Sequence, residues 1–160
     1  MRYILIAALT LAAAASAAVS SETISSYLDS LEADYEVSES GNEFVLLTQS
    51  AQGEQWPFMY ISIDSEAEAC YMEAMTPAVI PASGAARTEA LEKLTEMNWN
   101  FPFTKFAVNP ETNEVSATYV FTTENGIGFD AFGAMVYVLI GTVQESISDL
   151  EAISAAPQGQ

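Results

Sequence analysis

The stretch NWNFPFTKFAVNPETNEVSATYVF, residues 98–121, decides the fold. From Glu114 to Thr122 apolar and polar side chains alternate, which is typical of a strand with one buried and one polar face. A shorter apolar segment, residues 105–108, precedes it, and Asn109-Pro110 between the two favours a turn that joins antiparallel strands. The stretch therefore predicts a β-hairpin that begins shortly after the end of a helix.

The residues after this hairpin predict one long apolar helix, from residue 129 to about residue 153. A loop with two glycines, residues 124–128, precedes it. No charged residue lies within residues 131–143, a pattern that favours covering on more than one side, by the sheet and by a second subunit in a homodimer. Apolar residues repeat along one stripe of this helix: Phe129, Phe132, Val136, Leu139, Ile140, Val143, Ile147 and Leu150.

The part of the chain before the hairpin predicts two further helices and four further strands. Together with the hairpin and the last helix they predict one α+β domain over residues 21–153. The polar residues 154–160 are expected to form a disordered tail. The two helices are expected over residues 21–33 and 83–97, and the four strands over residues 35–39, 42–48, 58–63 and 67–75.

The N-terminus has the pattern of a secretory signal peptide over residues 1–18. Arg2 precedes a short apolar run, and the small residues Ala15-Ser16-Ala17-Ala18 end it, so cleavage after Ala17 or Ala18 fits the pattern. The run is shorter than the roughly 20 apolar residues that span a bilayer. Because no cysteine stands at the cleavage site, a lipid anchor is not expected. The pattern therefore predicts a periplasmic or secreted protein that does not insert in a membrane after cleavage.

The chain is strongly acidic, with 22 Asp and Glu residues, 4 Lys and Arg residues and a formal net charge of -18. Such a charge repels nucleic-acid phosphates and anionic lipid surfaces, so neither is expected as a partner. Solubility and a salty habitat are the simplest explanations of the acidity, and a cationic partner is a third.

The residue types that carry most catalytic and metal chemistry are scarce. The chain has no histidine and one cysteine, Cys70, which excludes Ser–His and Cys–His catalysis and the common transition-metal sites. The acidic turn from Asp64 to Glu68 lacks the spacing of a calcium loop. No catalytic, metal-binding or cofactor-binding residue is therefore predicted. A carboxylate-only envelope hydrolase and a cation-binding homo-oligomer stay open as alternatives to a binding protein.

Two aromatic stretches are candidates for binding an unidentified protein or peptide. One contains Trp56, Phe58 and Tyr60, and the other contains Phe101 and Phe103. Exposed aromatic side chains often mark interfaces, whereas buried aromatic residues at corners between a helix and a strand are commoner still.

The opening stretch also resembles the YbjN-domain family. The resemblance rests on the helix end Asn98-Trp99-Asn100, on Lys105-Phe106 in the strand after it, and on Phe129 and Phe132 after a pair of glycines. This family, described as bacterial sensory transduction regulators, has a fold like that of type III secretion chaperones. The resemblance implies a twisted antiparallel sheet packed by helices, often dimeric, with a protein-binding rather than a catalytic role.

The corner after the second helix is expected to be a structural anchor. Trp99 would supply a large buried surface there, and the Asn100 amide would satisfy backbone groups left open where helix becomes strand. Both side chains would then hold the second helix on the sheet.

The chain departs from the family pattern at two places. Many exported relatives have two cysteines in the region of Asp64 and Cys70, so the resemblance implies that a disulfide is lost here. Arginine is usual where this chain has Thr104-Lys105, which weakens any contact with anions. The expected function is a non-catalytic, exported, chaperone-like module for protein binding or regulation.

Overall fold

Residues 19–49 and 55–154 are described by a computed structural model, and they form four helices and six strands. The predicted signal peptide over residues 1–18, residues 50–54 and most of the predicted tail, residues 155–160, lie outside these ranges. The helices are α1 (Ser21–Ser30), α2 (Gly84–Asn100), α3 (Phe129–Glu145) and α4 (Ile147–Ser154). The strands are β1 (Asp34–Val37), β2 (Glu43–Gln49), β3 (Gln55–Asp64), β4 (Ala69–Val79), β5 (Lys105–Val108) and β6 (Glu114–Thr122).

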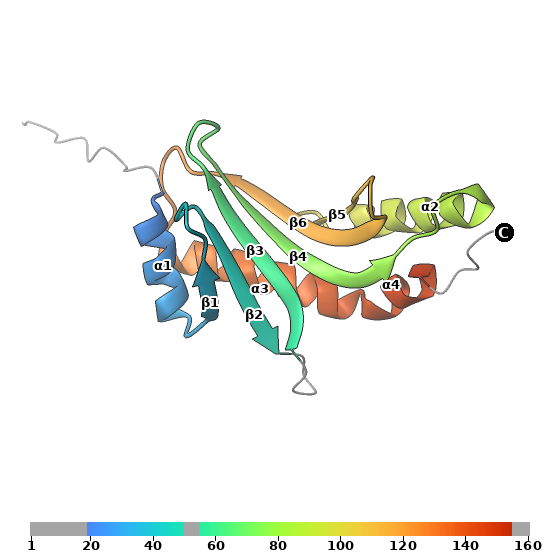
Figure 1. Cartoon of the computed structure of the whole chain (residues 1–160), viewed down its shortest axis with the longest axis horizontal. Coiled ribbons are helices and arrows are strands. Elements are labelled where there is room, and N and C mark those ends of the chain that lie inside the picture. The colour runs from blue at the N-terminus through green and yellow to red at the C-terminus, as the bar shows by residue number, and fades with distance from the viewer. Residues whose placement is uncertain (1–18, 50–54, 155–160) are drawn as a thin grey trace, which may run out of the picture.

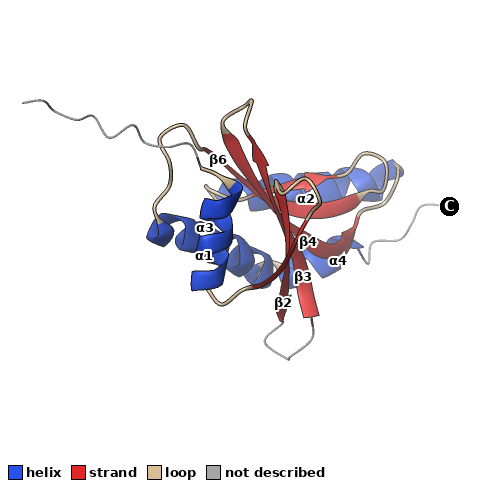
Figure 2. Cartoon of the chain, turned by 60° about the vertical axis from the view of Figure 1, so that its left-hand side comes forward, coloured by secondary structure: helices blue, strands red, loops and turns tan. Residues whose placement is uncertain are grey.

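The six strands form one antiparallel sheet in the order β1-β2-β3-β4-β6-β5. The predicted hairpin is confirmed, since β5 pairs with β6 from Lys105 opposite Thr118 to Val108 opposite Val115. In Figure 1 the strands cross in front of α3, and Figure 2 shows α1 and α3 side by side on one side of the strands. The α+β prediction is therefore confirmed as a twisted sheet packed by helices.

The hydrophobic core lies between the sheet and the apolar stripe of α3. As the stripe predicted, Val136, Leu139 and Val143 are buried, and α3 packs against β4 and β6. On the far side of α3, Tyr137 is 64% exposed and Val138 is 41% exposed. In the single chain, the second side of this helix is thus uncovered by the described residues.

The first helix is tied to the start of α3 by aromatic contacts. Ile24 and Leu28 face the core, and the Ser20 side chain caps the helix by accepting a hydrogen bond from Thr23 N at 3.2 Å. The Tyr27 ring lies 5.7 Å from that of Phe129 and 5.5 Å from that of Phe132, which is fully buried. Phe132 is therefore a core residue, as its place in the apolar stripe predicted, while Phe129 at the helix end is 37% exposed.

The prediction of one continuous C-terminal helix was wrong, because the chain bends by 52° between α3 and α4. The bend lets α4 follow the twisted sheet, so that Leu150 and Ile153 are buried and α4 packs against β4. Ser154 is the last residue of α4, not the start of a tail, and its Oγ accepts a hydrogen bond from Val79 N at 2.7 Å. No single described helix has the length and apolar composition to cross a membrane, and only the bent pair of α3 and α4 together meets that test.

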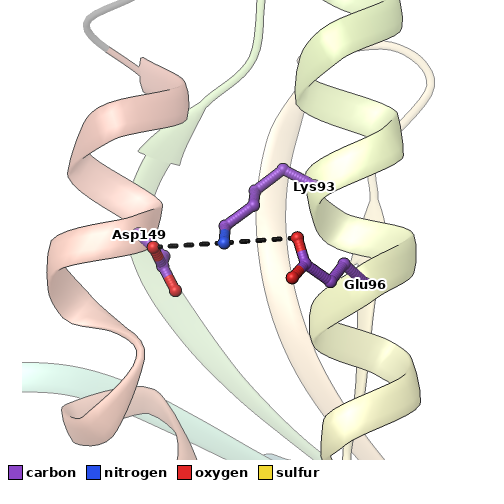
Figure 3. A network of polar contacts seen from close by, with 3 residues as sticks. All are labelled: Lys93, Glu96 and Asp149. Carbon is purple, nitrogen blue, oxygen red and sulfur yellow. Dashed lines mark hydrogen bonds and ion pairs between the residues drawn. The ribbon is translucent and has the colours of Figure 1, made fainter.

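The helices α2 and α4 are linked by a three-residue ionic contact (Figure 3). Lys93 Nζ lies 3.4 Å from a carboxylate oxygen of Glu96 in α2 and 3.5 Å from one of Asp149 in α4. Both carboxylates raise the pKa of the Lys93 ammonium. Because these groups face solvent, the contact adds little to stability.

Candidate functional site

The face of the sheet turned away from the helices is the candidate functional site. Side chains along a strand point alternately to the two faces, so each strand presents one row to the core and one to this second face. No helix of the described residues covers it, and in Figure 1 it is turned towards the viewer. We call it the open face; its apolar residues include Val45, Phe58, Tyr60, Tyr71 and Val120, and its acidic residues include Glu36, Glu43 and Glu73.

Large apolar side chains are exposed on the open face. Phe58 is 49%, Tyr60 43%, Tyr71 41% and Val120 53% exposed, whereas the alternate residue Met59 is fully buried. A solvated sheet face normally carries polar side chains, and a group of exposed aromatic residues on a soluble protein marks an interaction surface.

The strand register places Tyr60 near the middle of this face. Tyr60 lies opposite Val45 on β2 and opposite Glu73 on β4, and Glu36 on β1 lies opposite Val45. A hollow of about 460 Å³ opens at this place. Its lining includes Glu36, Val37, Glu43, Val45, Tyr60, Ser62 and Glu73.

The open face is acidic as well as apolar. Two further hollows flank the first, one lined by Asp64 and Glu66 and the other by Glu111. Among the described strands, Lys105 is the one residue with a positively charged side chain. Its Nζ does not pair with a carboxylate but donates to the backbone carbonyls of Asn98 and Phe101, at 2.9 Å each. Its charge is thus held at the end of α2, and the carboxylates around Tyr60 form no ion pair within the described residues.

The predicted partner-binding residues do not form one surface. Phe58 and Tyr60 lie on the open face, and the Trp56 side chain lies outside the residues whose side chains are described. Phe101 is half-buried and meets Phe106 edge to face at 6.2 Å. Phe103 is 66% exposed but stacks at 6.5 Å on Tyr119, which packs against the core, so it lies on the helix-bearing side.

The expected anchor at the end of α2 was assigned to the wrong residues. Trp99 is 88% exposed and Asn100 is also exposed. Asn98 performs the predicted role: its Oδ1 accepts from Phe106 N at 2.6 Å and its Nδ2 donates to the Phe106 carbonyl at 3.1 Å. The helical period explains the error, since position 99 is rotated about 200° from the buried Met97.

Sequence reasoning also missed Tyr71 and Val120 as members of the open face. On β4 the row of Tyr71 continues through Glu73 to Met75, so its alternation gave no signal, whereas Val120 stands among the polar alternate positions of β6. An apolar residue at a position that alternation assigns to solvent was the available signal.

The described residues offer little for metal or thiol chemistry. Within residues 19–49 and 55–154 no three side chains of His, Cys, Asp or Glu are grouped so that they could hold a metal ion. Cys70 is fully buried opposite Ile63 and Phe121, and burial raises the pKa of its thiol to about 12. The thiol is therefore a small apolar core group.

Comparison with solved structures places the fold among bacterial regulators and secretion chaperones. YbjN from E. coli is similar with a TM-score of 0.64 and 13% identity, over 85% of this chain and 96% of that one. A chain of the HopA1–SchA chaperone–effector complex has a TM-score of 0.55 and 8% identity, over 77% and 88%. A chain of the ExoU–SpcU complex from the Pseudomonas aeruginosa type III secretion system has a TM-score of 0.54 and 15% identity, over 84% and 99%.

No match was found among curated proteins. A family model does match, and its range, residues 20–152, includes every helix and strand described above except the end of α4. The chain therefore belongs to the YbjN family, which is described as "Putative bacterial sensory transduction regulator".

Proposed function

We propose that this protein is an exported, non-catalytic module that binds another protein through its open face. The observation that carries the proposal is the group of exposed Phe58, Tyr60, Tyr71 and Val120 on a sheet face that no described helix covers. Burying apolar surface is the main favourable term in protein association. Because this apolar face stays exposed in the folded chain, a partner that covers it would gain the free energy of burying it.

The comparisons support a binding role of the chaperone type. The family is described as regulatory; one similar fold comes from a chaperone–effector complex and another from a heterodimeric complex of a type III secretion system. The partners in those complexes are partners of those proteins and are not proposed for this chain. What is proposed here is the mode of action: a small acidic α+β domain binds a polypeptide. The buried Cys70 thiol, with its raised pKa, fits a role that needs no nucleophile.

Cross-linking in a native extract tests the binding role. The purified protein would carry a photoreactive amino acid at position 60 and be irradiated in envelope extract of the producing cell. The matched control carries the same group at position 89 on α2, which is also exposed but lies off the open face. We expect one polypeptide to be recovered from position 60 and not from position 89. Recovery of no polypeptide from either position, together with turnover of a small molecule, would replace the proposal with an enzymatic role.

Export belongs to the same proposal and is supported by the pattern of residues 1–18. The chain with a C-terminal tag would be expressed in a Gram-negative host and the periplasmic fraction analysed by intact mass. We expect the tagged protein in that fraction, beginning at Ala18 or Val19. A tagged protein that keeps residues 1–18 and stays in the cytoplasm would contradict export and leave the binding role to stand alone.

A further inference from the structure

We propose that the open face selects a basic, amphipathic segment of its partner, with apolar side chains on Phe58, Tyr71 and Val120 and cationic side chains around Tyr60. This inference rests on the proposed function and names the chemistry of the partner at that same surface. Two independent properties of the face carry it: the position of its apolar residues and the sign of its charge.

The apolar residues form the floor of the face. Tyr71 on β4 and Val120 on β6 lie directly opposite each other, and the Tyr60–Glu73 pair is the next pair along this face of β3 and β4. Residues that are opposite or diagonal on the same face of a sheet are within reach of one long side chain. A partner that offers only charge would leave these exposed side chains in water, so the segment has to be amphipathic.

Acidic residues lie around Tyr60 on this face. Glu36, Glu43 and Glu73 line the hollow of about 460 Å³ around Tyr60, and none of them forms an ion pair within the described residues. A lysine or arginine side chain in this hollow would meet carboxylates and could lie over the Tyr60 ring, an arrangement favourable to both. The one lysine of the sheet, Lys105, is occupied by the α2 carbonyls and does not compensate these charges.

The charge also decides between a foreign partner and a second copy of this chain. Two open faces packed together would bring Glu36, Glu43 and Glu73 of one copy against the same residues of the other. Like charges that face each other across an interface oppose association, so the carboxylates disfavour this dimer. The uncharged outer side of α3, with Tyr137 and Val138, is better suited to self-association than the open face.

A pair of synthetic peptides tests the inference. One is an amphipathic 18-residue sequence of leucine and lysine, and the other has the same pattern with glutamate in place of lysine (~18 residues make ~5 helical turns). Binding to the purified protein is measured by fluorescence anisotropy at low and at physiological salt. We expect the lysine peptide to bind and the glutamate peptide not to bind. Equal binding of both peptides would overturn the charge selection.

Matched variants locate the binding. The open-face triple variant is Glu36→Gln, Glu43→Gln and Glu73→Gln. The control triple variant Glu89→Gln, Glu92→Gln and Glu151→Gln removes the same charge from exposed positions of α2 and α4. Truncating coupled charges at an interface changes affinity strongly, so we expect the first variant to weaken binding about tenfold or more and the second by less than about threefold. Equal weakening would mean that the peptide responds to net charge only and would overturn the proposed site.

A third variant tests the contact with the Tyr60 side chain, and light scattering tests whether a second copy of the chain occupies the face. Tyr60→Ser should weaken the lysine peptide while keeping the melting temperature within a few degrees, because Tyr60 is 43% exposed. A wild-type dimer that Tyr60→Ser converts to a monomer would overturn the inference, since a second copy would then occupy the face.

The two proposals can fail separately. If the cross-linked partner from the extract is recovered equally well with the open-face triple variant, the basic-segment inference is overturned and the binding role stands. If the extract yields no partner from either labelled position, the binding role itself fails, whatever the synthetic peptides do.

Discussion

Asn98 hydrogen-bonds to both backbone groups of one residue, Phe106: it accepts from its N–H at 2.6 Å and donates to its carbonyl at 3.1 Å. This pair joins the last turn of α2 to the edge strand β5 in the way that a neighbouring strand would. Asn98→Ala would leave the Phe106 N–H without this partner. We expect the variant to lose about 1–3 kcal/mol in the free energy of unfolding, measured by urea denaturation.

The neighbouring asparagine supplies the control for this change. Asn100 has the same side chain two residues further along α2 but is exposed. Asn100→Ala should change the free energy of unfolding by less than about 0.5 kcal/mol. Equal losses for the two variants would show that the bidentate contact is not what holds β5.

Trp99 is expected to matter little for stability despite its size. Its side chain is 88% exposed, so Trp99→Ala removes few packing contacts and should change the free energy of unfolding by about 0.5 kcal/mol or less. The comparison variant Phe132→Ala, at a fully buried position, should lose about 3–5 kcal/mol.

Fluorescence tests the same exposure without a change at position 99. In a Trp56→Phe background Trp99 is the remaining tryptophan. A water-soluble quencher should reach it in the folded protein nearly as well as in urea. Strong protection in the folded state would place the indole in an interface, most simply between two copies of the chain.

Most of the fold follows from the sequence because its signals are local. The alternation in residues 114–122 and the apolar segment over residues 105–108 predict β6 and β5 with the observed bounds. The helical spacing of Ala90, Leu94 and Met97 predicts the buried side of α2. Asn98 lies four residues after Leu94 and therefore on the same side of α2, whereas Trp99 lies off that side, so the period alone excludes Trp99 from the anchor.

Features that depend on the twist of the sheet could not be predicted in this way. The bend of 52° between α3 and α4 follows the surface of β4. The apolar spacing of the sequence around Ser146 does not predict it. The open face is also non-local, because Tyr60, Tyr71 and Val120 come from three strands that are brought together by the order β3-β4-β6. Tyr60 and Tyr71 alone are ordinary apolar residues at strand positions, and Val120 alone, among the polar positions of β6, carries a local signal.

Arg87 joins the start of α2 to the turn between β5 and β6. Its Nη1 donates to the Pro81 carbonyl at 2.9 Å and to Asn113 Oδ1 at 2.7 Å, and the Asn113 carbonyl in turn accepts from Ile80 N at 3.0 Å. Asn113 has a φ of 62°, a left-handed conformation that these contacts hold in place. Arg87→Ala should lose about 1.5–3 kcal/mol, the usual contribution of hydrogen bonds from a charged donor.

Hydrogen exchange separates this clamp from a general effect of charge. The Ile80 amide should exchange faster in Arg87→Ala, because its acceptor sits on the released turn. Lys93→Ala removes the same charge from an exposed position of α2 and should leave that amide unchanged. Slow exchange at Ile80 in both variants would show that the turn keeps its conformation without Arg87.

Cys70 should make stability depend on alkaline pH. Burial raises the pKa of its thiol from 9.0 to about 12, so above pH 9 the unfolded chain releases a proton that the folded chain keeps. The stabilisation from this group is therefore complete below pH 9. It falls as the pH rises, by about 1.4 kcal/mol per pH unit until about pH 12.

The variant Cys70→Ala lacks the thiol and tests this dependence by urea denaturation. Between pH 8 and pH 10 the wild type should lose about 1 kcal/mol more of its free energy of unfolding than Cys70→Ala does. Other alkaline groups, such as Tyr35, act in both proteins and cancel in this comparison. Parallel pH profiles for the two proteins would mean that the thiol ionises in the folded chain, which would place Cys70 within reach of water.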